Sequence, residues 1–250
     1  MKPEFLAFPR RFYAPPAAFK DGLVFLDGEE THHLTKVLRL GPGAKVQVGN
    51  GQGRNVAAMV ERLEAGGAVL KILEELAPWG ESPLDLTLGI GLAKGEALDA
   101  VVRQATEMGV KRILPFISER SEQVTPERAA RRQTKWQRLA RESLKSCRRS
   151  FLPQIEKPQD FAAVLAGPEP LKLMFWEEEL GGGLQAFLGQ PRPAGVRVLI
   201  GPEGGFSSRE AAQARDAGYE VVSLGPRLLK VPTAALAALT LIQFAWGDLA

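Results

Sequence analysis

The stretch from Val196 to Trp246 decides the fold of this chain. It begins V-R-V-L-I-G-P-E-G-G-F-S-S-R-E (196–210) and resumes as G-Y-E-V-V-S-L-G-P-R-L-L-K-V-P-T-A-A-L-A-A-L-T-L-I-Q-F-A-W (218–246). Two short apolar runs, Val196–Ile200 and Tyr219–Leu224, are each stopped by a Gly-Pro pair, which does not continue a strand. Each pair leads toward a helix. The pattern therefore predicts two buried strands, each followed by a loop and a helix.

The two helices that follow these loops have recognisable starts. Ser207 and Glu210 form a capping box, and Gly218 ends the helix that this box opens. Pro232 stands where the second helix begins, because its missing N–H would have no partner in a first helical turn. From Thr233 to Trp246 this helix has no formal charge and is apolar on nearly every side. It is therefore expected to be buried on more than one face.

The two Gly-Pro loops are candidates for a ligand site. In open α/β sheets, small ligands bind beyond the carboxyl ends of the strands, and glycine lets the backbone approach them closely. The simpler alternative is that both loops are ordinary strand-to-helix turns without a ligand, since Gly and Pro are common in turns. The spacing of the residues leaves both alternatives open.

Residues 1–73 are expected to form a small strand-rich domain. Its predicted strands are Leu23–Leu26, Lys45–Val48, Arg54–Val60 and Ala68–Leu73. Between the first two, Thr31–Leu40 has a short helix-like apolar face. The adjacent His32 and His33 point about 100° apart on a helix, and the sequence has no other histidine, so we expect no metal site.

A Pro- and Gly-containing linker at residues 74–82 separates this domain from residues 83–250. After it, a strand with one apolar face (84–92), a helix (96–108) and a further strand (111–117) form a βαβ unit. Later segments add a strand at 171–175, a Gly-rich loop at 181–183 and a short helix at 184–188. The second part is therefore predicted to be an α/β domain.

The helix predicted at 125–149 has an unusual charge distribution. Six basic residues fall within about 60° of one line on a helical wheel. They are Arg131, Lys135, Arg138, Arg141, Lys145 and Arg149. Glu142 is the single acid between Arg128 and Arg149. An RNA partner would relieve the mutual repulsion of these charges and release counterions, whereas the alternative is an ordinary solvated face.

Composition narrows the classes of protein. The 250 residues carry a net charge of only +3, so overall charge does not by itself indicate a nucleic-acid partner. A single cysteine, Cys147, fits a reducing compartment. The N-terminus has no signal-peptide core, and the uncharged run 231–247 falls short of a membrane span. We therefore expect a cytoplasmic protein without a membrane partner. P-loop, dinucleotide-binding, C-x-x-C and G-x-S-x-G motifs are absent from the sequence.

The paired motifs I-G-P-E-G-G-F (200–206) and L-G-P-R-L-L-K-V-P-T-A-A-L-A-A-L (224–239) resemble the signature of the SPOUT methyltransferases. The chain is most similar to the bacterial 16S rRNA uridine-N3 methyltransferases (RsmE-like), and the resemblance extends over most of its length. It implies an α/β domain whose loops form a trefoil knot around S-adenosylmethionine. R-R-F-Y (10–13) and H-H-L-T-K-V-L-R-L (32–40) resemble the same family's PUA-like RNA-binding domain. A homodimer paired through the C-terminal helix is also implied.

The resemblance also implies site residues. The donor site would comprise Phe175, Trp176, Glu177, Ile200, Gly201, Pro202, Glu203, Gly204, Gly205, Leu224, Gly225, Pro226, Leu228, Leu229 and Thr233. The candidate RNA-binding residues are Arg10, Arg11, His33, Lys36, Arg39, Lys94, Arg131, Lys135, Arg138, Arg141 and Lys145. Arg149, Lys230 and Glu203 are the catalytic candidates, with the two cations stabilising the anion that develops on the uracil oxygens.

The chain departs from the family pattern near these candidates. Ser146-Cys147-Arg148-Arg149 stands where the family often has Q-S-G-R, and Lys230 replaces an arginine. Pro232 stands where the second loop commonly has a glutamate, which leaves Glu203 as the carboxylate of the two motifs. Glu203 could equally be a cap near a helix start. The rival hypotheses are a non-catalytic RNA-binding ribosome assembly factor and an enzyme that binds another nucleotide in the same loops.

Overall fold

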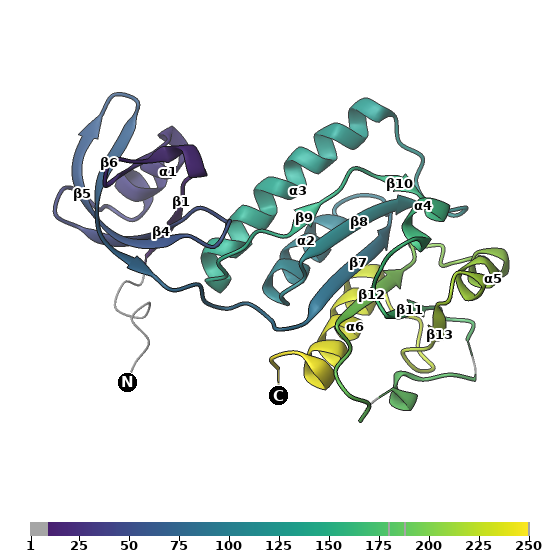
Figure 1. Ribbon diagram of the computed structural model, residues 1–250. Coiled ribbons are helices and arrows are strands. Elements are labelled where there is room, and N and C mark those ends of the chain that lie inside the picture. The colour runs from purple at the N-terminus through teal and green to yellow at the C-terminus, as the bar shows by residue number, and fades with distance from the viewer. Residues whose placement is uncertain (1–9, 180, 188, 250) are drawn as a thin grey trace. The chain divides into compact units, whose positions relative to one another are not determined.

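The computed structural model describes residues 10–179, 181–187 and 189–249 and divides into two compact units (Figure 1). The first unit comprises the chain up to Glu81 together with Arg141–Leu152, and the second comprises Ser82–Ala140 and the chain from Pro153 onward. Helix α3 (Pro126–Cys147) therefore contributes residues to both units. The sequence suggested two domains that follow one another along the chain. It did not predict that the end of α3 belongs to the first unit, because long-range packing decides which residues join each unit.

The first unit is built on a six-stranded sheet in the order β1-β4-β5-β6-β3-β2. Its strands are β1 (Arg11–Tyr13), β2 (Phe19–Lys20), β3 (Leu23–Leu26), β4 (Lys45–Gly49), β5 (Asn55–Glu64) and β6 (Gly67–Leu76). All neighbours are antiparallel except β1, which lies parallel to β4. Inward-facing side chains such as Val46, Val48 and Leu70 form one apolar core.

The sequence predicted β3 to β6 of this unit, although β5 and β6 are longer than expected. It did not predict β1 or β2, because two or three residues are too few to show a period. The short helices are η2 (Pro16–Ala18), α1 (Gly28–His32) and η3 (His33–Val37). The helix-like segment expected at 31–40 is thus one turn of α-helix followed by one of π-helix, with Leu34 buried beneath it.

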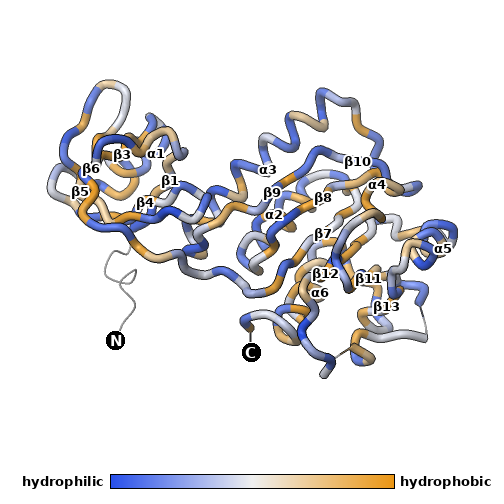
Figure 2. Tube along the Cα trace, in the orientation of Figure 1, coloured by the Kyte–Doolittle hydropathy of each residue, from blue (hydrophilic) through white to orange (hydrophobic). Residues whose placement is uncertain are grey.

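The second unit contains a seven-stranded sheet that is parallel throughout. Its main order is β10-β8-β7-β12-β11-β13, and β9 pairs with β8. The strands are β7 (Asp85–Gly91), β8 (Arg112–Ile117), β9 (Gln154–Ile155), β10 (Gln159–Asp160), β11 (Leu171–Phe175), β12 (Gly195–Ile200) and β13 (Glu220–Val222). Their apolar runs are visible inside the unit in Figure 2. Both faces of the sheet are buried at β7 and β12. The sequence predicted one apolar face for β7, but Thr87 and the two glycines of its other face are buried as well.

Helices cover this sheet. They are α2 (Ala97–Glu107), α4 (Phe161–Leu165), η4 (Leu184–Ala186), α5 (Ser208–Asp216) and α6 (Val231–Trp246), besides part of α3. The capping box predicted at Ser207 and Glu210 opens α5. Helix α6 packs against α2 and β12, and α4 and α5 contribute Phe161 and Ala211 to a separate apolar cluster. No helix in the described ranges is both long enough and apolar enough to cross a membrane.

A buried polar network lies near the amino ends of the parallel strands. Oε2 of Glu169 accepts a hydrogen bond from Nε of Arg197 at 2.9 Å, and Oε1 accepts one from Thr87 at 2.8 Å. Burial alone would raise the pKa of Glu169, but the hydrogen bonds from Arg197 and Thr87 outweigh it and lower the pKa to about 2. Burial raises the pKa of nearby Tyr219 to about 12. This network joins β7 and β12 to the segment before β11, at the end of the sheet opposite the carboxyl ends of these strands.

Candidate functional site

Three neighbouring parallel strands end at the same level in the second unit. Phe175 of β11 is in register with Ile200 of β12 and with Val222 of β13. The loops that follow these strands therefore meet at one edge of the sheet. There they enclose a cavity of about 680 Å³. The two Gly-Pro loops singled out in the sequence are the second and third of these segments.

Most of the residues expected at a donor site line this cavity. They are Phe175, Trp176, Glu177, Ile200, Gly201, Pro202, Glu203, Gly205, Leu224, Gly225, Leu228 and Leu229, together with the catalytic candidate Lys230. Gly204, Pro226 and Thr233 are not in the lining. Arg227, inside the predicted loop segment 224–229, also lines the cavity. The remaining lining residues were not predicted from the sequence: Ala97, Ser223, Val231, Pro232 and Ala234.

The Gly201–Gly205 loop needs its glycines. Gly205 has φ +67°, and a Cβ there would overlap Oε1 of Glu177 and lie 2.7 Å from its Cδ. A Cβ at Gly91, the last residue of β7, would lie 2.5 Å from the backbone nitrogen of Pro202. The backbone of this loop therefore lies against both a cavity carboxylate and the neighbouring strand, a closeness that only glycine permits.

Hydrogen bonds fix the same loop from outside. Glu210 accepts from the backbone N–H of Ser207 and from that of Glu119, each at 2.9 Å. The carbonyl of Phe206 accepts from Nε1 of Trp176 at 3.1 Å and from Arg120 at 3.3 Å. The capping box thus ties the loop after β8 to the start of α5. These hydrogen bonds hold the cavity wall in place, and one of them comes from Trp176, which itself lines the cavity.

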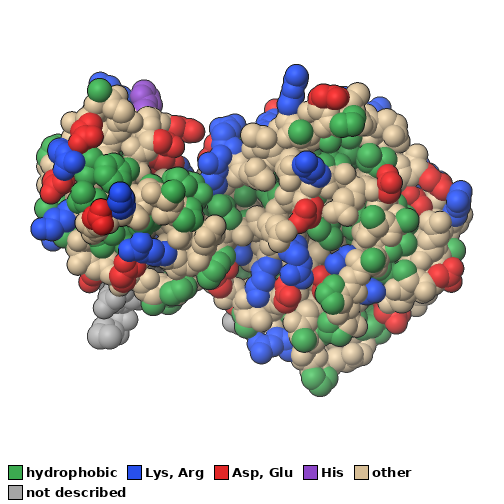
Figure 3. All heavy atoms as spheres, turned by 45° about the horizontal axis from the view of Figure 1, so that its top comes forward, with side chains coloured by type: hydrophobic (Ala, Val, Ile, Leu, Met, Phe, Trp, Pro, Cys, Tyr) green, Lys and Arg blue, Asp and Glu red, His purple; other side chains and the backbone are tan. Residues whose placement is uncertain are grey.

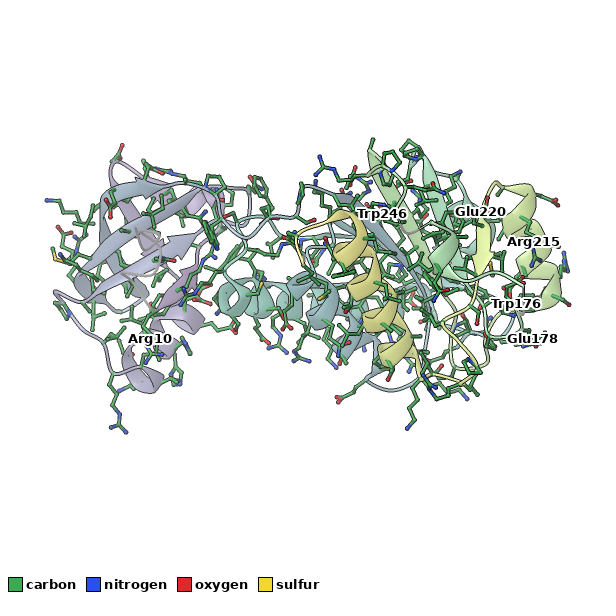
Figure 4. The ribbon with its side chains drawn as sticks, turned by 90° about the horizontal axis from the view of Figure 1, so that it is seen from below. Arg10, Trp176, Glu178, Arg215, Glu220 and Trp246 are labelled. Carbon is green, nitrogen blue, oxygen red and sulfur yellow. The ribbon has the colours of Figure 1, made fainter. Side chains whose placement is uncertain are left out.

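The segment after β11 is fixed by Trp176. Its backbone N–H donates to the carbonyl of Val222 at 3.0 Å. The guanidinium of Arg215 lies 5.9 Å from the centroid of the Trp176 ring and is 2.5 Å from Oε2 of Glu179 (Figure 4). Glu177 and Glu178 are exposed. A cation over an aromatic ring is attracted to it, so Arg215 stabilises this turn of the chain.

The third loop presents its backbone to the cavity. Across the described ranges, the peptide groups of Leu224, Leu228 and Leu229 make no hydrogen bond. Helix α6 begins at Val231, with Lys230 as the N-cap residue and Pro232 in its first turn. Peptide groups without a protein partner beside an apolar pocket can select a ligand by hydrogen bonding.

Four charged residues line the cavity, and all four are exposed: Glu177, Glu203, Arg227 and Lys230. Oε1 of Glu203 accepts a hydrogen bond from the backbone N–H of Lys94 at 2.8 Å. This contact ties Glu203 to the loop before α2 and is not a helix cap, because α2 begins at Ala97 with Glu96 as its N-cap residue and α5 is capped by Ser207. By contrast, the side chains of Glu177 and Lys230 form no ion pair and no hydrogen bond with any residue that the structure describes. These two side chains are therefore available to a ligand.

Arg149 does not line the cavity. It belongs to the first unit, is 2% exposed, and donates from Nη2 to Oε2 of Glu81 at 2.9 Å. Glu81 also accepts from the backbone N–H groups of Ser150 and Phe151. The guanidinium of Arg149 therefore stabilises the turn after α3 through Glu81. The sequence did not predict this contact.

The candidate RNA-binding residues have different surroundings. Arg10, Lys36, Arg39, Lys94, Arg131, Lys135 and Arg138 are exposed, and Arg11, His33, Arg141 and Lys145 are half-buried. On α3, Lys135 lies 2.5 Å from Asp99, and Lys145 lies 2.5 Å from Glu30. Protein carboxylates therefore neutralise part of the basic face. In Figure 3 the basic side chains are interspersed with acidic ones on the visible face.

A second cavity, of about 590 Å³, lies wholly within the first unit. Its lining includes Arg10, Arg11, His32, His33, Lys145 and Arg148, as well as three glutamates. Arg148 has φ +65°, which is uncommon for a residue with a side chain. The residues that the structure describes contain no cluster of three or more His, Cys, Asp or Glu that could hold a metal.

Comparison with known families defines the class of protein. The RNA methyltransferase domain family matches residues 80–243, and the RNA methyltransferase PUA domain family matches residues 26–73. The first match covers more than half of the chain, and it includes the strand-end loops around the cavity. The chain therefore belongs to the RNA methyltransferase family.

Individual relatives narrow this assignment. Ribosomal RNA small subunit methyltransferase E of Synechocystis is 33% identical over 237 residues, which is 93% of this chain and 77% of the relative. The enzyme of the same name from Aquifex aeolicus is 31% identical over 77% of this chain and 82% of its own. The crystal structure of ribosomal RNA small subunit methyltransferase E from Neisseria gonorrhoeae, bound to S-adenosylmethionine, aligns with a TM-score of 0.86 at 30% identity, covering 96% of this chain and 99% of that one.

Proposed function

We propose that this protein methylates N3 of a uridine in 16S ribosomal RNA, using S-adenosylmethionine. The observation that carries the proposal is the cavity formed by three glycine-bearing loops at the ends of β11, β12 and β13. The relatives named ribosomal RNA small subunit methyltransferase E support the RNA substrate, and the bound S-adenosylmethionine in one of them supports the donor. The N3 position follows from the family resemblance. With ribosomal RNA as the proposed substrate, we propose that the protein acts in the cytoplasm.

The residues of the cavity fit such a donor. The walls are mainly apolar, as an adenine ring requires, and the unpaired peptide groups of Leu228 and Leu229 can read the edge of that ring. At Gly205 the absence of a side chain lets the backbone line the pocket. Glu177 offers a carboxylate to the hydroxyl or ammonium groups of the donor. When bound, S-adenosylmethionine supplies a methyl group that its sulfonium has already activated.

The remaining work falls to the residues of the chain. A neutral imide nitrogen is a poor nucleophile, so the protein must stabilise the anion that forms when the N3 proton leaves. Lys230 is exposed at the cavity and can place its ammonium near a uracil oxygen. Glu203, held by the N–H of Lys94, is the candidate proton acceptor in the motif. Arg149 stays a proposed second electrostatic group on the family resemblance alone, since its guanidinium is paired with Glu81 and does not line the cavity.

RNA recognition is assigned to residues 1–73 and to the basic side of α3. A paired uridine would first have to leave its stack, which favours single strands and loops as targets. The linker at 74–82 and a methyltransferase domain at 83–250 complete the proposed organisation. We further propose that the loops around the cavity form a trefoil knot, as the resemblance to the SPOUT methyltransferases implies.

A homodimer paired through α6 belongs to the same proposal. Phe244 is 61% exposed, and Leu241 and Leu249 are also exposed along or just beyond this helix. Leu228, at the cavity loop, is 81% exposed. A second copy would cover these apolar side chains. Light scattering at micromolar concentration should give twice the monomer mass, and a monomer would contradict this part of the proposal.

The rival function is an RNA-binding ribosome assembly factor without catalysis. Calorimetric titration with S-adenosylmethionine separates the two. The proposal predicts saturable binding with one site per chain. RNA affinity without any binding of S-adenosylmethionine would favour the rival, and competition by ATP would indicate that the cavity takes another nucleotide.

A further inference from the structure

We propose that the second cavity, in the first unit, is a pocket for one backbone phosphate of the RNA, with Arg11 as its principal cation. This deepens the proposed function and rests on it, because the polyanion is taken to be the RNA substrate. The starting observation is the burial of Arg11. Burial lowers the pKa of Arg11 to about 10, while the charges of Cys147 and Glu81 act in the opposite direction. A cation removed from water in this way normally has an anion beside it.

In the part of the chain that the structure describes, no carboxylate forms an ion pair with Arg11, although the charge of Glu81 acts on it from farther away. The guanidinium donates from Nη2 to the neutral amide oxygen of Asn55 at 2.6 Å, and its buried Nε has no hydrogen-bond partner. No described carboxylate lies within ion-pair distance of it. By contrast, neighbouring Lys145 is paired with Glu30. Arg11 is therefore a pre-placed charge whose partner is expected to come from a ligand.

Arg11 is also rigidly placed. Asn55, which accepts its hydrogen bond, is 7% exposed and donates to Oγ of Ser150 at 2.8 Å. Ser150 in turn accepts from the backbone N–H of Trp79 at 2.8 Å. Three chain segments thus hold the guanidinium in one position. Such positioning lowers the entropy cost of binding an anion, and the planar fork of arginine matches a phosphate.

The cavity around Arg11 is lined by four basic residues, Arg10, Arg11, Lys145 and Arg148, against the three acidic residues Glu29, Glu30 and Glu142. Exposed Arg10 lines the same cavity, and His32 and His33 add ring N–H donors. The carboxylate of Glu30 is already occupied, because it also accepts from the backbone N–H of Tyr13 at 3.2 Å. A phosphodiester of RNA offers the oxygens that these donors require.

The test measures how RNA affinity depends on salt. A fluorescent 16S ribosomal RNA fragment is titrated with the wild-type protein and with Arg11→Met, from 50 to about 300 mM salt, a range over which phosphate contacts are resolved. We expect roughly tenfold weaker binding at low salt and a slope of log affinity against log salt that is smaller by about 1. Arg62→Met is the matched control, because Arg62 lies in the same unit on β5 and pairs with Glu61 and Glu64. It should change neither quantity.

An unchanged slope for Arg11→Met would overturn the phosphate pocket, even if affinity fell, because loss of a structural contact does not alter counterion release. If Arg11→Met cannot be purified folded, Arg10→Gln replaces it, and an unchanged slope there overturns the proposal in the same way. Binding of S-adenosylhomocysteine is measured in parallel. Wild-type protein that fails to bind it would count against the proposed function, whereas a change limited to the salt slope concerns the pocket alone.

Discussion

Replacing Gly205 by alanine tests the donor site most specifically. The backbone at Gly205 has φ +67°, and an added Cβ would overlap the carboxylate of Glu177. The methyl group must therefore displace the carboxylate that lines the cavity. Loss of a hydrogen bond to a charged group is worth about 1.5–3 kcal/mol, which corresponds to roughly 10- to 100-fold weaker binding of S-adenosylhomocysteine. Isothermal titration calorimetry measures this directly.

Gly218→Ala is the matched control. Gly218 also has a positive φ, of +81°, but its added Cβ would meet nothing within 4 Å, and the residue does not line the cavity. Both variants should lose about 1–2 kcal/mol of unfolding free energy from backbone strain, so only Gly205→Ala should lose donor affinity. In the Glu177→Gln background, Gly205→Ala should add little, because both changes act on one carboxylate. Equal affinities of the two glycine variants would refute this account of the pocket.

Three further predictions concern single residues. Because the pKa of Glu169 lies near 2 in the folded protein and near 4.5 when unfolded, its stabilisation is complete above pH 4.5. About 3 kcal/mol should be lost as pH falls from there toward 2. Urea unfolding across this range should show a loss that is larger by about this amount in wild type than in Glu169→Gln, in which the other carboxylates still titrate. Lys230→Met should lower turnover roughly 100-fold or more with donor affinity nearly unchanged, and a matching loss of affinity would assign Lys230 to donor binding instead. Arg149→Ala should lower turnover far more than donor affinity, with Glu81→Gln as the control for the turn that they share; equal losses of both would remove Arg149 from the mechanism.

Much of the second unit could be predicted from local sequence patterns. The capping box at Ser207 and Glu210 and the strands around Ile200 and Phe175 were predictable, because strong periodicity and capping chemistry act over a few residues. The short strands β9 and β10 could not be predicted, because two residues are too few to show a hydrophobic period. Their place in the sheet depends on β8, which lies far away in the sequence.

The sequence did not show which acidic residues pair with the basic residues of the predicted site. The basic face of α3 was visible in the sequence, but its pairing with Asp99 and Glu30 was not, because both carboxylates come from distant segments. The same reason explains Arg149: nothing near it in the sequence indicates that Glu81 engages its guanidinium. Sequence reasoning therefore located the charged groups, whereas packing decides which of them a ligand can use.

The most direct test of the central claim is to map the product. Small ribosomal subunits from a strain that lacks the enzyme are incubated with the protein and S-adenosylmethionine, and the 16S RNA is digested and analysed by mass spectrometry. We predict one added methyl group, on N3 of a single uridine, and its absence when Lys230→Met replaces the wild type. Subunits that bind the protein yet gain no methyl group would show that the cavity between the three loops does not serve methyl transfer.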